Sequence, residues 1–211
     1  MHQIIALTIL CLIVATSAEY TDLQLRRDMM YNQQGSPKEY SHSYMITDTN
    51  SIFLTSYDLS SISSNIKIVS ASLYIASQDI DEKEHEAPTS NEHSLLQTLT
   101  TNIDSTVTIS VSKYFDEKIS SAKVQSGLVP ITQQTIRKGE TIAVDITQAV
   151  TSAIEAKLQE LSLGFKIVDS RPVSFASRED DPRSSYIIVQ YEKEKPKPSL
   201  HIRVVTSDLK N

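Results

Sequence analysis

The chain has 211 residues and carries 20 basic against 26 acidic side chains, which gives a formal net charge of -6. With 39% hydrophobic residues it is not a disordered tail, and its length suits one domain with a proper core, or two small ones. The acidic balance argues against a nucleic-acid partner, because phosphates favour a basic surface. A single cysteine excludes a disulfide scaffold and any cysteine-based zinc knuckle.

An apolar run opens the chain. Residues 4–14 are uninterrupted by any charge, but a membrane span needs about 20 such residues. Small residues follow and end at Ala18, before the charged Glu19. This pattern predicts a secretory signal peptide over residues 1–18; a buried first strand or a signal anchor is the alternative. The mature chain, 19–211, is then expected to be a single secreted, extracellular domain without cysteine and without a membrane span.

Short segments that alternate apolar and polar residues recur along the mature chain, as strands with one buried face do. Turn signals separate them, and serine and threonine are abundant between the apolar positions. The pattern predicts an all-β sandwich or jelly roll. The predicted strands cover residues 51–59, 66–75, 106–111, 142–146, 161–168, 172–177, 185–192 and 199–205.

One segment departs from the two-residue period. Apolar residues from Ile146 to Leu161 recur mostly at every fourth position, which predicts an amphipathic helix over about 147–160 with Thr147 as its N-cap. The expected fold is therefore an antiparallel jelly-roll β-sandwich with one amphipathic helix. The polar, acidic stretches 77–93 and 178–184 are predicted to be loops.

Six sequence elements in this chain resemble, in order and rough spacing, those of the DNRLRE-type domain, also classed as carbohydrate-binding module family 96. They extend over about residues 40–206. The elements are YDLSSI (57–62), VSASLYI (69–75), VDITQAV (144–150), LGFKI (163–167), FASRE (175–179) and PSLHI (198–202).

The resemblance implies a jelly-roll sandwich and a polysaccharide or cell-surface glycan as ligand. The family usually carries a tryptophan near the position of residues 112–117, whereas this chain has none. Tyr114 or Phe115 could fill the same packing site. A remoter similarity, to the sandwich of the TGF-β propeptide, rests on the helix entry at residues 144–150.

No arrangement typical of an enzyme stands out in the sequence. Carboxylates are numerous, but no pair has a distinctive spacing for general acid–base chemistry. The isolated Gly127 and Gly139 form no G-x-S-x-G turn, no phosphate-binding loop and no dinucleotide fingerprint. We therefore expect a protein that is not an enzyme.

Metal sites are weakly indicated. His85 and His93 lie in an acidic loop, but their spacing is not one that zinc ligands use. Clustered carboxylates could hold a structural calcium ion, although acidic loops are usually only solvated. The calcium candidates are Asp79, Asp81, Glu82 and Glu84, or Glu179, Asp180 and Asp181. No cofactor is expected.

Arg178 and Glu179 end the FASRE element. In a functional interpretation, the planar guanidinium of Arg178 grips a sugar hydroxyl or carboxylate. In a structural one, Arg178 is tied to a nearby acid, for instance Asp58 or Asp145, and closes the sandwich. We favour the structural interpretation, because the motif would serve any member of the family whatever its ligand.

Basic and aromatic side chains are the remaining candidates for glycan contact, namely Arg171, Arg178, Arg183, Tyr114 and Tyr186. Because the chain is acidic, neutral glycans are expected to be preferred over anionic ones such as alginate, to which some relatives are linked. The expected function is that of a secreted, non-catalytic protein resembling a carbohydrate-binding module. The alternative is a structural or adhesive extracellular protein that uses the sandwich for protein–protein contacts.

Overall fold

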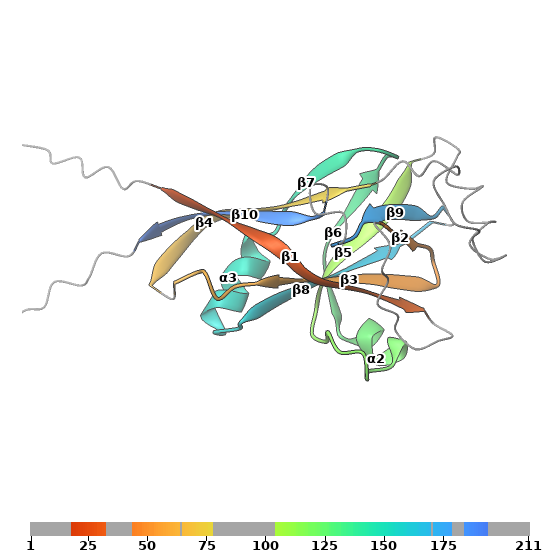
Figure 1. The fold of residues 1–211 in the computed structure, drawn as a ribbon, viewed down its shortest axis with the longest axis horizontal. Helices are drawn as coiled ribbons and strands as arrows, with labels where there is room; N and C mark the ends of the chain where they lie inside the picture. Colours follow the sequence, from red (N-terminus) through yellow and green to blue (C-terminus); the bar gives the residue numbers. More distant parts are fainter. Residues whose placement is uncertain are drawn as a thin grey trace, which may run out of the picture.

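The computed structural model describes residues 18–32, 44–63, 65–77, 104–169, 171–178 and 184–193, and these are mostly β-strand (Figure 1). The all-β prediction is confirmed, and every strand pairing is antiparallel. The strands are β1 (Glu19–Asn32), β2 (Tyr44–Thr47), β3 (Ser51–Asp58), β4 (Ile66–Ala76), β5 (Ser105–Ser112), β6 (Leu128–Ile136), β7 (Thr141–Asp145), β8 (Glu160–Ile167), β9 (Val173–Ala176) and β10 (Tyr186–Lys193). The helices are α2 (Ser121–Ser126) and α3 (Thr147–Glu155).

Four strand pairs are nested along the chain: β1 with β10, β3 with β8, β4 with β7, and β5 with β6. Further pairing of β4 with β10, β5 with β8 and β1 with β3 joins them into one sheet. Its order is β6-β5-β8-β3-β1-β10-β4-β7, and the sheet curls until it is nearly barrel-shaped. Strands β2 and β9 form a separate pair, joined to the end of β4 by a bridge between Ser77 and Phe175.

Strand β1 belongs to both halves of this sheet. Residues 19–24 pair with β10, and residues 25–32 pair with β3. The register shifts between Leu25 and Arg27, so that the strand carries a bulge where it passes from one half to the other. We call the half built from the start of β1 with β10, β4 and β7 the β10 half, and the rest the β8 half.

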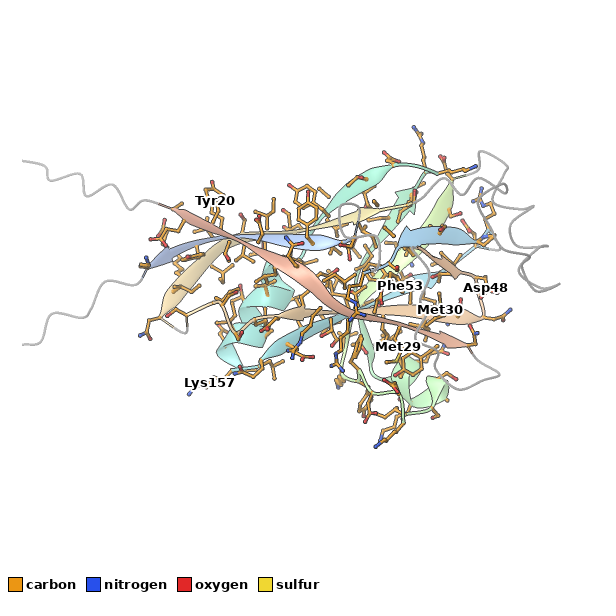
Figure 2. All side chains as sticks on the ribbon, viewed as in Figure 1. Tyr20, Met29, Met30, Asp48, Phe53 and Lys157 are labelled. Atoms are coloured by element: carbon orange, nitrogen blue, oxygen red, sulfur yellow. The ribbon has the colours of Figure 1, made fainter. Side chains whose placement is uncertain are left out.

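The main core fills the space between the two halves. Phe53, Phe165 and Phe175 pack together in it, with ring centroids 5.5–5.6 Å apart. Figure 2 labels Phe53. Along β10, Ile187 and Val189 are buried in this core while their neighbours face outward. Helix α3 covers one end of the core with Val150 and Ala153.

A second apolar cluster lies on the outer side of the β8 half. The burial pattern of β3 lacks alternation, because Phe53 and Tyr57 face the main core while Ile52 and Leu54 face this second cluster. Its cover is the chain segment 113–127, which includes α2, and Val124 is its fully buried contact. The outer face of the β8 half is therefore closed by the protein's own chain.

The predicted strands between residues 51 and 192 coincide with β3, β4, β5, β7, β8, β9 and β10, so these predictions are confirmed. The strand expected at 199–205 lies outside the described residues. Strands β1, β2 and β6 and helix α2 were not expected from the sequence pattern.

The helix over 147–160 is confirmed only for its first part, since α3 ends at Glu155. The backbone N–H of Lys157 bonds to the Ile154 carbonyl, and that of Leu158 to the Ala153 carbonyl, which is the Schellman arrangement. Lys157 has a left-handed φ of 56° there.

The N-cap prediction is wrong. Ile146 occupies that position, and Thr147 is the first helical residue. The Thr147 hydroxyl instead donates to Asp145 at 2.6 Å and accepts the backbone N–H of Ala71 at 2.9 Å. It thus ties the start of the helix to β4.

The left-handed Lys157 gives a first prediction. Glycine adopts this conformation without the steric cost that a side chain carries, so Lys157→Gly should raise the free energy of unfolding by about 0.5–1 kcal/mol. The matched control is Glu155→Gly two residues earlier, within the helix, which should lower it by about 1 kcal/mol. Urea denaturation of both variants measures the difference; two changes of the same sign would contradict the assigned helix end.

Candidate ligand-binding surfaces

The side chains proposed as ligand contacts do not gather in one place. Arg183 and Glu179 lie outside the described residues, as do all the zinc and calcium candidates in the 77–93 and 178–184 loops. Arg171 donates to Asp169 at 2.8 Å, and the same carboxylate accepts the backbone N–H of Thr106 at 2.8 Å. Arg171 therefore helps to hold the turn after β8 against β5.

Tyr114 is part of the cover over the second cluster. Its ring packs on Gly127 so closely that a Cβ on this glycine would lie 2.5 Å from Cδ2 of the tyrosine. The amine of Lys123 stands 5.2 Å from the ring centroid on another side. Both Tyr114 and Phe115 pack against the second cluster. Tyr114 therefore contributes to packing in this structure, whereas its role as a ligand contact stays a prediction.

The predicted cluster of Arg178 with Asp58 and Asp145 is not formed. Asp145 accepts hydrogen bonds from Thr147 at the start of α3. Asp58 accepts the backbone N–H of Ser60 and lies 3.7 Å from the guanidinium of Arg26.

Arg178 itself contacts β1 instead. Its backbone N–H donates to the buried carboxylate of Asp28 at 2.6 Å, and its exposed guanidinium donates to the carbonyl of Arg26 at 3.2 Å. The partners named for Arg178, Asp58 and Asp145, were wrong, and the choice between a structural and a ligand-binding role for Arg178 stays a prediction.

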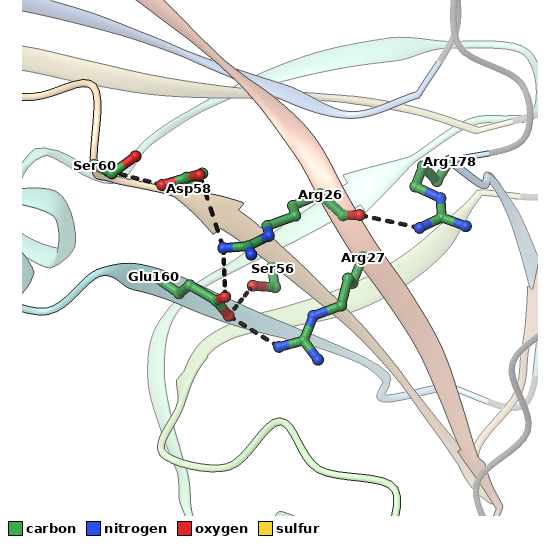
Figure 3. A network of polar contacts seen from close by, with 7 residues as sticks. All are labelled: Arg26, Arg27, Ser56, Asp58, Ser60, Glu160 and Arg178. Atoms are coloured by element: carbon green, nitrogen blue, oxygen red, sulfur yellow. Dashed lines mark hydrogen bonds and ion pairs between the residues drawn. The ribbon is translucent and has the colours of Figure 1, made fainter.

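The polar network that does form centres on Glu160, the first residue of β8 (Figure 3). One carboxylate oxygen accepts from Arg26 at 2.7 Å, and the other accepts from Arg27 at 3.0 Å and from the Ser56 hydroxyl at 2.9 Å. Three strands, β1, β3 and β8, are joined by this one carboxylate.

The bulge in β1 explains how two consecutive arginines reach the same group. In a regular strand Arg26 and Arg27 would point to opposite faces of the sheet. Because the register shifts between Leu25 and Arg27, both side chains turn toward Glu160. Arg27 also lies over the Phe115 ring, with Cζ 4.6 Å from its centroid, and so connects the network to the cover.

In this network the positive charges of Arg26 and Arg27 lie against the carboxylate of Glu160. Partial burial alone would raise the pKa of Glu160, but hydrogen bonds from Ser56 and Arg27 and the charges of Arg27 and Arg26 outweigh it, so the pKa lies below its usual value. Its carboxylate is already bonded by two arginines and a hydroxyl. Such a group suits a role in holding strands together better than one in gripping a ligand.

A different surface carries aromatic side chains that no described segment covers. Leu23, Ile187, Leu73 and Val144 form one cross-strand row of the β10 half and are buried in the main core. Their neighbours in each strand therefore face outward. We call the outward rows the tyrosine face. They are Gln24, Tyr186, Tyr74 and Ala143; Asp22, Ile188, Ser72 and Asp145; and Tyr20, Gln190 and Ser70.

The tyrosines of this face are arranged in two groups. Tyr74 and Tyr186 are directly paired across β4 and β10, and their rings stack with centroids 5.0 Å apart and an interplanar angle of 8°. Tyr20, near the start of β1, is 65% exposed (Figure 2). Of the sequence-predicted contacts that the structure describes, Tyr186 alone lies on this face.

The sequence analysis missed Tyr74 and Tyr20. Tyr74 was not named as a contact, although it shares its outward face with Ser70 and Ser72. This alternation with serines was the available signal. Tyr20 lies in β1, for which no strand was predicted from the sequence. The later part of β1 is buried on both faces, so the strand as a whole has no regular period.

Within the described ranges, no three histidine, cysteine, aspartate or glutamate side chains are grouped to hold a metal ion. The same ranges include no helix that has both the length and the apolar character needed to cross a membrane.

The Glu160 network gives a second prediction. A carboxylate whose pKa is lowered by folding stabilises the protein above its ordinary pKa of about 4.3, and this contribution is lost as the pH falls through the lower folded value. Glu160→Gln should therefore reduce the free energy of unfolding at pH 7 by about 1–2 kcal/mol. The difference from the parent protein should shrink as the pH falls below about 4.

Denaturation curves from pH 7 to pH 3 measure this effect. Glu155→Gln, at an exposed position of α3, is the control and should change stability little at any pH. A Glu160→Gln loss that stays constant down to pH 3 would contradict the ionic origin of the effect.

No protein-family model matches the chain, and no curated protein is significantly similar to it. The likeness to the DNRLRE-type domain is therefore a resemblance carried by the six sequence elements alone.

Proposed function

We propose that this chain is a secreted, non-catalytic carbohydrate-binding protein of the DNRLRE type, and that it binds a polysaccharide or cell-surface glycan on the tyrosine face. The observation that carries the proposal is the stacked pair of Tyr74 and Tyr186 with the exposed Tyr20, set among serine, glutamine and aspartate side chains. Aromatic rings pack against the C–H faces of sugars, and the polar side chains can bond sugar hydroxyls.

The strand order supports a jelly roll, the architecture that the resemblance implies. If β2 and β9 are left aside, the first strand pairs with the eighth, the second with the seventh, the third with the sixth and the fourth with the fifth. A long antiparallel hairpin rolled up on itself has this nested pairing. Lectin domains are among the proteins built on this plan.

The contrast between the two outer faces also supports the location. Segment 113–127 closes the outer face of the β8 half, and its aromatic side chains are used for packing. The aromatic side chains of the β10 half stack on one another or stand exposed, and no described segment lies over them.

A protein partner that adds a strand to the sheet fits less well. The edge strand β6 contains Pro130, which has no N–H to donate, and its register with β5 shifts at that point. The opposite edge, β7, is short. We therefore rank the adhesive or structural alternative second.

Export is the part of the proposal that rests on the sequence of the first 18 residues. Strand β1 starts at Glu19, so cleavage after Ala18 would leave the whole strand intact. Glu19 accepts the Tyr191 hydroxyl at 3.1 Å and pairs with Lys193 at 2.6 Å, and both contacts survive the cleavage.

We accordingly expect the exported protein to begin at Glu19. N-terminal sequencing or intact-mass analysis of secreted material measures this directly. Ala18→Phe should block or shift the cleavage, because signal peptidase requires a small residue there. Secreted protein that retains residue 1 would contradict the prediction.

The test of function is a glycan array with the purified mature chain. We expect binding to one or more glycans, reduced about tenfold or more in Tyr186→Ala, because a stacking contact contributes on the order of 1 kcal/mol or more. Gln133→Ala, at an exposed position of β6 on the other half, should bind like the parent. Thermal unfolding of each variant shows whether the fold is retained. Absence of binding by the folded parent to any glycan would overturn the proposal.

A further inference from the structure

The tyrosine face offers two aromatic contacts rather than one. Tyr186 lies on β10 and is paired with Tyr74, whereas Tyr20 is paired with Gln190, four residues further along β10. At a rise of about 3.4 Å per residue, the two aromatic positions are about 13 Å apart. One monosaccharide cannot contact both, but a chain of several sugars lying along β10 can.

The row between the two aromatic positions contains one apolar side chain, flanked by two that can form hydrogen bonds. Ile188 and Ser72 occupy the middle row, with Asp22 beside them on β1. At the Tyr20 end, the Ser70 hydroxyl donates to the amide oxygen of Gln190 at 3.1 Å. This hydrogen bond uses the amide oxygen and so fixes the direction of the Gln190 NH2 donor. A sugar chain that crosses the middle row and the Tyr20 row would meet hydroxyl, amide and carboxylate groups.

The charge on this face is of one sign. The three rows contain the carboxylates of Asp22 and Asp145 and no lysine or arginine. The whole chain is also acidic, at -6. The hydroxyls of an uncharged sugar can donate to a carboxylate, whereas uronate or sulfate groups are repelled by it.

Resting on the proposed glycan-binding function, we infer that the tyrosine face binds an uncharged, extended glycan chain that runs along β10 from the Tyr74–Tyr186 pair to Tyr20. Short oligosaccharides occupy the Tyr74–Tyr186 end alone. Longer ones reach Tyr20 as well, and affinity rises with chain length until both ends are filled. Glycans that carry acidic groups are excluded.

Isothermal titration of the mature chain with oligosaccharides of one to six units tests this. The uncharged probes are β-1,4-glucan, β-1,3-glucan, xylan and mannan oligosaccharides, and the anionic probe is an alginate series. We expect affinity for at least one uncharged series to rise with length and level off, to change little with added salt, and to exceed that for alginate.

Two variants test the two ends of the tyrosine face separately. Tyr186→Ala should weaken short and long oligosaccharides alike, by about tenfold. Tyr20→Ala should leave the short ones unchanged and remove the gain that comes with length. Gln133→Ala is the matched control and should behave like the parent at every length.

Failure of this inference can be distinguished from failure of the proposed function. Salt-sensitive binding that is tightest for alginate, or affinity that is the same for one sugar and for six, would overturn this inference while leaving glycan binding in place. A Tyr20→Ala protein that keeps the full gain with length would overturn the path along β10. If no probe of any charge binds, the proposed function fails as well.

Discussion

The bulge in strand β1 is the constraint on which both halves of the sheet depend. One strand has to end its pairing with β10 and begin its pairing with β3 within two residues, at Leu25 and Arg27. An extra residue in a strand increases its twist and bend, which is what a sheet needs in order to curl around a core. The cost is that two charged side chains, Arg26 and Arg27, emerge on the same side. Glu160 offsets this cost by binding both of them.

The Glu160 network and the tyrosine face lie on different halves of the sheet. The carboxylate of Glu160 and the arginines of β1 bond to one another, and Arg27 also lies over Phe115 in the cover. Arg26 and Arg27, which are 51% and 41% exposed, are thus already paired with a carboxylate. The tyrosine face, in the other half, carries carboxylates as its only charges. The two surfaces of one sheet therefore differ in how their charges are paired.

The sequence predicted the strands well where one face is buried and the other exposed. In β4 and β10, core residues such as Leu73 and Ile187 alternate with outward ones, and both strands were found. It failed for β1, since Met29, Met30 and Tyr31 are consecutive buried residues in a strand covered on both sides. Alternation cannot appear there. The short helix α2 was missed for a similar reason: its single buried residue, Val124, forms no periodic pattern.

The candidate site shows the same limits. Tyr186 was named as a possible contact, but its partner Tyr74 was not, because tyrosine suits either side of a strand. The partners of Arg178 could not be predicted, since Asp28 is 150 positions away and lies in a strand that the pattern did not reveal. Contacts between distant segments depend on the pairing of strands, which a local pattern of residues does not contain.

The nested pairing also has a consequence for how the chain folds. Glu19 accepts the Tyr191 hydroxyl, 172 positions later, so β1 has no partner on the β10 side until β10 has been synthesised. Contacts of such high sequence separation make folding slow, because a long loop must close before they stabilise anything. In the meantime β1 presents apolar side chains and unpaired backbone groups that favour aggregation. The pairing of β1 with the β10 half can therefore be completed only after β10 is free to bind it.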